Sequence, residues 1–248
     1  PFHKSKFPDI KMINKDELFN CDMFVFCASV GVPKVGDEDR DVRLIQYEGN
    51  SKILNVYGKM ARNSGYKGVF AVLSDPVDML CKSLFISSNT RDDGSMDYQG
   101  LAPEQIKGYG LGVMNARANY YARDKYNYYN KEGRAYGPHG KGLIIADSII
   151  NYDKNVSDYL TNRATTANID IRQAGFKPYV APALSSGALS IIATIRGEWH
   201  YSTNYIDGVF MGCLNRNNQS GLEFERCNLP EKLRERIINT YNHLRNLD

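Results

Sequence analysis

The sequence lacks three features that would assign it to a specialised class of protein. It has no uninterrupted run of about 18 or more apolar residues, so it offers no expected membrane span. Its 5 cysteines are odd in number and form no Cys-x-x-Cys pair, which favours reduced thiols in a cytoplasmic protein over a disulfide framework or a metal site. A formal net charge of +3 is too small to make nucleic acid an expected partner.

What remains is an ordinary globular composition, with 42% hydrophobic and 24% charged residues among 248. A chain of this length can bury a sizeable core in one large domain or two modest ones. The bulk numbers therefore leave most enzyme classes open, and the local patterns have to decide.

The first part of the chain has a strand–helix–strand pattern. Residues 21–30 (CDMFVFCASV) and 67–76 (KGVFAVLSDP) are short, nearly unbroken apolar runs, which are typical of strands buried on both faces of a parallel sheet. Between them, residues 41–65 carry apolar side chains at helical spacing and end on Asn-Ser-Gly, a common helix stop. We therefore expect a right-handed crossover unit.

The later part of the chain has a mixed pattern that begins near residue 95. We expect a short strand followed by a helix from residue 106, and a terminal amphipathic helix over 229–247. Two further helices and two antiparallel strands are expected between them, over 162–176, 182–197, 204–216 and 221–226. This change of pattern predicts two lobes that meet at a cleft.

Five motifs occur in a characteristic order along the chain: GVPKVGDEDR (31–40), SDPVDML (74–80), GYGLGVMNAR (108–117), GPHGKG (137–142) and GFKPYVAPALSSGAL (175–189). Together they resemble the lactate/malate dehydrogenase family from about residue 8 to the C-terminus. The resemblance implies an α/β fold with a Rossmann-type parallel sheet, incomplete at its N-terminus, followed by a mixed α+β domain. Residues 1–95 would be the remainder of a dinucleotide-binding domain, and residues 96–248 the catalytic and substrate domain.

The resemblance also implies a chemistry, in which a nicotinamide cofactor exchanges hydride with a 2-hydroxy or 2-oxo acid. It makes His139 the acid/base, Arg117 the clamp for the substrate carboxylate, and Arg40 the arginine that arrives with a closing loop. Each has a plainer interpretation. His139 could be a structural residue of a glycine-rich turn, Arg117 a salt-bridge partner, and Arg40 part of a solvated charged loop.

Two positions depart from the family pattern around His139. The aspartate that orients the family histidine is Met114 here, and a thioether carries no charge. The family asparagine before Pro-Val, which contacts the substrate, is Asp75. An ionised carboxylate there would repel an anionic substrate unless it is protonated or paired. We hypothesise that Asp75 takes over part of the missing aspartate's role towards His139.

Two lysines fall at positions that line the family's substrate pocket. Lys34 lies where the family discriminates between substrates, and Lys177 where a small polar residue is usual. With Arg117 and Arg40 they would form a cationic pocket that prefers dicarboxylates to pyruvate-like monoanions, although lysine lacks the bidentate geometry of arginine. The alternative is that both lysines point to solvent.

The family's opening Gly-x-Gly-x-x-Gly segment is not found, and residues 8–14 resemble its third strand region. Several dozen N-terminal residues are therefore expected to be absent, with weak NAD binding or dependence on a partner chain. The remaining cofactor contacts are expected from Ala28, Ser29, Val30 and Leu73. The residue that would distinguish NADP from NAD, by contact with the 2′-phosphate, is expected to belong to the absent N-terminal segment. A homo-oligomer is the default for this family.

Two other functions compete with the dehydrogenase interpretation. Met114, Asp75 and the missing glycine loop are also compatible with a catalytically degenerate relative kept for binding or assembly. Residues 119–134 interleave tyrosines with basic residues, a pattern that can stack on single-stranded nucleic acid. These tyrosines fit helix packing better, so no nucleic-acid or membrane partner is expected.

Overall fold

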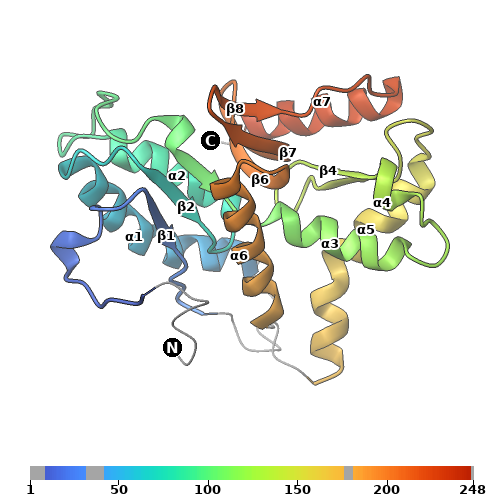
Figure 1. Ribbon diagram of the computed structural model, residues 1–248, viewed down its shortest axis with the longest axis horizontal. Helices are drawn as coiled ribbons and strands as arrows, with labels where there is room; N and C mark the ends of the chain where they lie inside the picture. The colour runs from blue at the N-terminus through green and yellow to red at the C-terminus, as the bar shows by residue number, and fades with distance from the viewer. Residues whose placement is uncertain (1–8, 32–41, 176–180, 247–248) are drawn as a thin grey trace.

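The fold is taken from a computed structural model of the chain, which describes residues 9–31, 42–175 and 181–246. Figure 1 shows a half with β1, β2, α1 and α2 on the left, a half with α3, α4 and α5 on the right, and α6 between them. The strongest sequence patterns, the long helix between two apolar strands and the C-terminal amphipathic helix, are both present.

The left half is the expected crossover unit. It consists of β1 (Met23–Phe26), α1 (Val42–Asn63), β2 (Val69–Val72), α2 (Val77–Asn89) and β3 (Ile106–Gly108), with 3-10 turns at Lys15–Glu17 and Pro103–Gln105. Strands β1, β2 and β3 pair in parallel in this order. Phe24 and Phe70 pack against each other from neighbouring strands, with ring centroids 4.8 Å apart. The prediction of a Rossmann-type parallel sheet is confirmed.

The rest of the described chain contains α3 (Leu111–Ala122), α4 (Tyr129–Glu132), β4 (Arg134–Tyr136), β5 (Ile144–Ala146), α5 (Lys154–Gln173), α6 (Ala181–Arg196), β6 (His200–Ile206), β7 (Val209–Asn218), β8 (Gly221–Phe224) and α7 (Glu231–Arg245). β3 pairs antiparallel with β6, so one sheet runs β1-β2-β3-β6-β7-β8 through both halves. The proposed division at residue 95 remains a prediction, and the sheet continues across it.

Two expectations about local structure are wrong. The single strand expected over 204–216 is a hairpin, in which β6 and β7 turn at Asp207 and Gly208. Both turn residues have positive φ, and the apolar residues on either side hid this break in the sequence pattern. The described part of the expected strand region at 8–14 contains no strand, because residues 9–14 are exposed and unpaired with the sheet.

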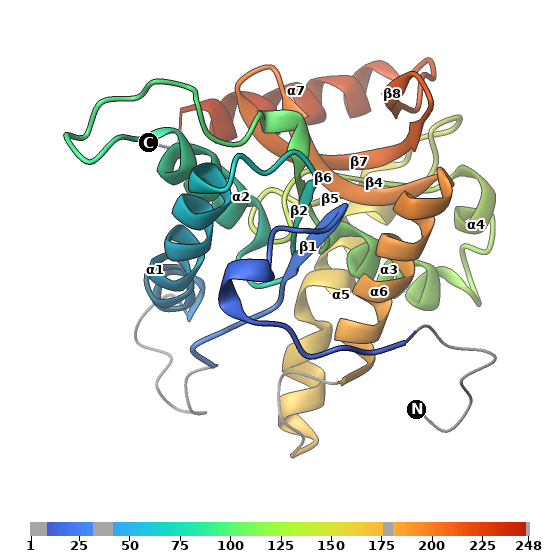
Figure 2. The ribbon, with the colours of Figure 1, turned by 60° about the vertical axis from the view of Figure 1, so that its left-hand side comes forward.

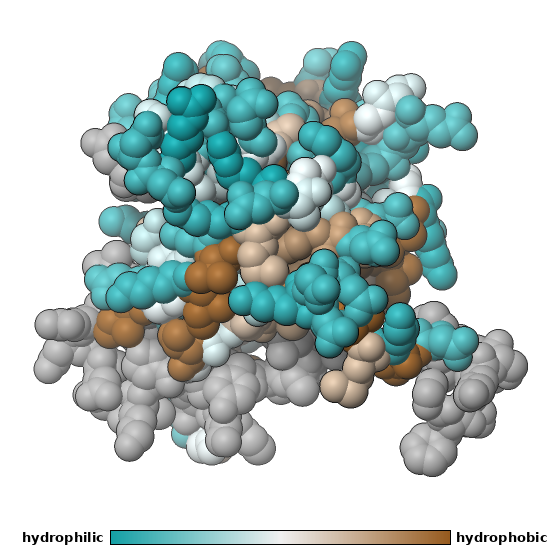
Figure 3. Space-filling view, turned by 90° about the vertical axis from the view of Figure 1, so that its left-hand side faces the viewer, coloured by the Kyte–Doolittle hydropathy of each residue, from teal (hydrophilic) through white to brown (hydrophobic). Residues whose placement is uncertain are grey.

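The β1 side of the sheet is an edge in the described part of the chain, where β1 pairs only with β2. Val25 in this strand is 38% exposed, and Ile10 and Met12 before it are more exposed still. Figure 3 faces this side of the molecule and shows hydrophobic side chains gathered across its middle, below a hydrophilic upper part.

Helices cover the two faces of the sheet differently (Figure 2). On one face, α2 packs so closely that a Cβ on Gly108 would lie 2.4 Å from Val77. On the other face, α6 covers a set of buried polar side chains. Tyr109 donates to Thr194 of α6, 2.9 Å away, and His200 lies 2.8 Å from the same hydroxyl. Polar seams of this kind fix one arrangement, since an unpaired buried group costs more than a paired one gains.

Lys107 is the buried cation of this seam, with only 1% of its surface exposed. It lies in β3 and donates to the side-chain oxygen of Asn204 in β6. Burial lowers the pKa of Lys107 to about 8, because the ammonium has lost most of its hydration. The unfolded chain therefore holds this proton more tightly than the folded chain.

Replacing this amine should change how stability depends on pH. Between pH 8 and 10.5 the unfolded wild-type chain binds more protons at Lys107 than the folded chain does, so this group makes stability rise with pH over that window. Lys107→Met should flatten the rise, measured as the free energy of unfolding in urea at pH 7 to 10. Lys232→Met, at an exposed lysine of α7, is the matched control. Parallel pH curves for wild type and Lys107→Met would contradict the assignment.

Candidate active site

The carboxyl ends of β1, β2 and β3 meet at one edge of the sheet, where open α/β sheets bind their ligands. The loop after β1 and the loop after β2 are joined there, since Ser74 donates to the carbonyl of Ala28 at 2.6 Å. Asn50 of α1, fully buried, contacts both loops by accepting from Val30 N–H and donating to the Asp75 carbonyl. No local sequence pattern signals Asn50, which is an amide in the middle of an amphipathic helix.

The histidine turn reaches this edge from the other half of the chain. Gly137 exchanges two backbone hydrogen bonds with Gly212 of β7, at 3.0 and 3.1 Å. Its φ of +94° and a carbonyl 2.8 Å from any added Cβ require glycine here. Two residues later, His139 projects towards the ends of β2 and β3.

His139 and Asp75 form the central contact of the site. Nδ1 of His139 lies 2.8 Å from Oδ1 of Asp75, with the imidazole 14% exposed and the carboxylate 49% exposed. An ionised carboxylate only accepts hydrogen bonds, so with Asp75 ionised this contact places a proton on Nδ1 of His139 and leaves Nε2 outside the pair. Asp75 is therefore paired, and its charge is offset whenever the imidazole is protonated.

The imidazole also packs against the start of α3. A Cβ on Gly110 would lie 2.8 Å from Cγ of His139, too close for any side chain at this position. Gly110 is the N-cap residue of α3. The ring is thus held between the loop after β2 and the first turn of α3.

Asp78 is a site residue that the sequence interpretation passed over. It lies in the first turn of α2, is 7% exposed, and accepts the backbone N–H of His139 at 2.6 Å. Burial raises the pKa of Asp78, and the hydrogen bonds from Thr203 and His139 oppose this rise. Its place three residues after Asp75, at a helix start, was the available signal.

Arg117 lies on α3, about two helical turns beyond Gly110 and so on roughly the same side of the helix. Its guanidinium donates to the carbonyl of Ala164 on α5 at 3.1 Å and contacts the sulfur of Met114 at 3.9 Å. Met114 is 2% exposed and belongs to a hydrophobic cluster with Leu111. The methionine thus packs as a core residue, at the position where the resemblance places the family aspartate.

The structure leaves part of the predicted set undescribed. Lys34, Arg40 and Lys177 lie outside the described residues. Ala28, Ser29 and Val30 are exposed after β1, and Leu73 is half-buried after β2, 3.2 Å from a Cβ placed on Gly187 of α6. Within the described ranges there is no cluster of three or more metal-ligating side chains. No helix in the described part of the chain is both long and apolar enough to cross a membrane.

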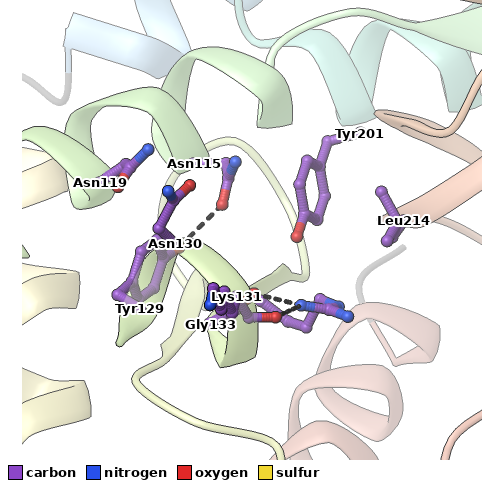
Figure 4. A pocket seen from close by; sticks show the side chains of 9 residues that line it. Asn115, Asn119, Tyr129, Asn130, Lys131, Gly133, Tyr201 and Leu214 are labelled. Carbon is purple, nitrogen blue, oxygen red and sulfur yellow. Dashed lines mark hydrogen bonds between the residues drawn. The ribbon is translucent and has the colours of Figure 1, made fainter. Parts of the chain in front are cut away.

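A separate cavity of about 300 Å³, which neither His139 nor Asp75 lines, lies beside α3, α4 and β4 (Figure 4). Its lining includes Asn115, Asn119, Tyr129 and Tyr201. Arg134 at this cavity is held by Glu225 through two contacts of 2.7 and 2.6 Å. None of its lining residues is a histidine or a carboxylate, so it offers no pair like His139 and Asp75.

No protein-family model matches the chain. It is 28% identical over 123 residues to an L-lactate dehydrogenase of Mycoplasma pneumoniae, an alignment that covers 49% of this chain and 35% of the relative. It is 26% identical over 181 residues to an L-lactate dehydrogenase of Oceanobacillus iheyensis, covering 68% of this chain and 52% of the relative. The chain thus spans between about a third and a half of these curated relatives.

Solved structures share the fold at lower identity. Malate dehydrogenase from Archaeoglobus fulgidus in complex with NADH has a TM-score of 0.68 and 17% identity, over 93% of this chain and 76% of that one. Lactate dehydrogenase from Eimeria maxima with NADH and oxamate has a TM-score of 0.70 and 15% identity, over 94% and 73%. The chain is thus similar in sequence to L-lactate dehydrogenases over part of its length, and it shares its fold with lactate and malate dehydrogenases.

Proposed function

We propose that the protein is a nicotinamide-dependent oxidoreductase that interconverts a 2-hydroxy acid and a 2-oxo acid. The observation that carries the proposal is the 2.8 Å contact between Nδ1 of His139 and Asp75 at the carboxyl edge of the parallel sheet. The contact gives the histidine a fixed orientation and a nearby negative charge. In the family pattern an aspartate supplies both, and the resemblance places Met114 at the position of that aspartate. The names of the curated relatives and of the NADH-bound neighbours support the same reaction class.

The residues at the sheet edge fit one end of a nicotinamide cofactor. The loop after β1 is exposed at Ala28, Ser29 and Val30. Leu73, which follows β2, lies at the same edge of the sheet. In this proposal these loops would hold the nicotinamide end of the cofactor. When bound, the cofactor supplies or accepts the hydride.

His139 moves the proton in this proposal. In the direction of reduction, Nε2 of the imidazolium donates to the ketone oxygen, and the imidazole is left neutral with its remaining proton on Nδ1. Asp75 stabilises the imidazolium by charge and keeps Nδ1 as the donor of the pair. Arg117 would bind the substrate carboxylate, and Arg40 would polarise the ketone oxygen. The proposal also includes NAD as the cofactor, in preference to NADP, and a homo-oligomeric protein.

Removing the charge of Asp75 should separate catalysis from stability. Asp75→Asn keeps the shape of the side chain and should lower kcat by about 10²-fold or more, because the imidazolium loses its counter-charge. The free energy of unfolding should change by less than about 1 kcal/mol, since the Asp75 carboxylate is about half exposed to solvent. Steady-state turnover of a 2-oxo acid with NADH, beside urea unfolding, measures both. Unchanged turnover in Asp75→Asn would rule out this role.

The same protein should bind NADH, which a fluorescence titration measures, and turnover of a 2-oxo acid then separates the dehydrogenase from its alternative. A degenerate relative kept for binding or assembly, the alternative that Met114 suggests, would show no turnover of any 2-oxo acid in wild type. The dehydrogenase proposal requires both binding and turnover.

The substrate should be a dicarboxylate. If Lys34 and Lys177 join Arg117 in the pocket, kcat/KM for a four-carbon 2-oxo dicarboxylate should exceed that for pyruvate by about tenfold, equivalent to about 1.4 kcal/mol of extra transition-state binding. Lys34→Ala should reduce this ratio, while Lys232→Ala, on the surface of α7, should leave it unchanged. A panel in which pyruvate is the better substrate would contradict the proposal.

A further inference from the structure

Asp78 contacts two segments of the chain that are far apart in sequence. One carboxylate oxygen accepts the backbone N–H of His139 at 2.6 Å, and the other accepts the hydroxyl of Thr203 in β6, also at 2.6 Å. The carboxylate is 7% exposed. A buried carboxylate with a specific donor on each oxygen has one orientation available to it, because either bond alone would leave the second oxygen unsatisfied.

The position of Asp78 in α2 explains how a carboxylate is tolerated there. It is the second residue of the helix, in the first turn, where unpaired backbone N–H groups create a positive potential. Burial acts against the charge, and the two short hydrogen bonds act in its favour. The helix start thus supplies a fixed acceptor at the point where the histidine turn arrives.

The main chain of that turn has two anchors, on different elements. Gly137 is paired with Gly212 of β7, and the N–H of His139 is bound by Asp78. Between them is only Pro138, whose φ is fixed by its ring. Loss of the second anchor would leave a backbone donor unpaired and allow the ring of His139 to shift away from Asp75.

We propose that Asp78 is a positioning residue, which holds the main chain of the His139 turn so that the imidazole stays between Gly110 and Asp75. It takes no proton and touches no substrate. Two carboxylates of one short segment would then orient His139 together. Asp75 binds its side chain, and Asp78 binds its backbone N–H. The inference rests on the proposed role of His139 as acid/base.

Two substitutions at this position separate positioning from charge. Asp78→Ala removes the acceptor and should lower kcat by about 10²-fold, as expected for a displacement of about 1 Å at the reacting group. KM for the 2-oxo acid should stay within about twofold, because Arg117 is untouched. Asp78→Asn keeps an oxygen that can accept the His139 N–H and should recover most of kcat. A kcat for Asp78→Ala equal to that of wild type overturns the inference.

A measurement on the His139 amide keeps this test independent of catalysis. In wild type, the amide should be protected from hydrogen exchange and its proton resonance shifted downfield by the short bond to a carboxylate. Asp78→Asn should move the resonance upfield, since the acceptor becomes neutral, and Asp78→Ala should also abolish the protection. If Asp78→Ala does not fold, the comparison of wild type with Asp78→Asn decides, and an unmoved resonance overturns the inference. A wild type without turnover but with these amide shifts would defeat the proposed function and leave the anchor standing.

Discussion

The arrangement of the rest of the site depends on the contact between His139 and Asp75. A histidine can serve as a directed proton donor only when one ring nitrogen is occupied and the other faces the reacting atom. Here Asp75 occupies Nδ1 at 2.8 Å. The Asp75 carboxylate is about half exposed, so we expect the pair to contribute little to the free energy of unfolding and to act on the orientation and charge of the imidazole. Asp78, Gly110 and Gly212 contact the turn that carries His139 and so help to hold the two side chains at this separation.

The surrounding fold achieves this with three elements that meet at one sheet edge. The parallel strands bring the loop of Asp75 to the carboxyl end of β2, and the first turn of α2 places Asp78 under the backbone of the histidine turn. Gly110 at the start of α3 leaves just enough space for the ring. Met114, which follows one turn later, packs in the hydrophobic core, and the carboxylate that contacts the ring is that of Asp75.

How much the sequence could reveal depended on the range of each interaction. Periodicity found α1 and α7 and the apolar strands β1 and β2, because local spacing determines them. The motif order led to His139 and Arg117, and the departure at Asp75 raised the question that the geometry addresses. The contact between Asp78 and Thr203 joins residues 125 positions apart in the sequence. The contacts that Asn50 makes with two loops reach up to 25 positions along the chain. No local pattern signals interactions of this range. The hairpin of β6 and β7 was missed because apolar residues continue on both sides of its turn.

A double-mutant cycle between Asp75→Asn and His139→Gln tests the central claim most directly, with turnover of a 2-oxo acid by NADH as the readout. If Asp75 acts through His139, its substitution should lower kcat strongly in wild type and have almost no further effect in the His139→Gln background, a coupling of about 2 kcal/mol or more. Effects that simply multiply, so that Asp75→Asn is equally damaging without the histidine, would show that the carboxylate acts elsewhere and contradict the account.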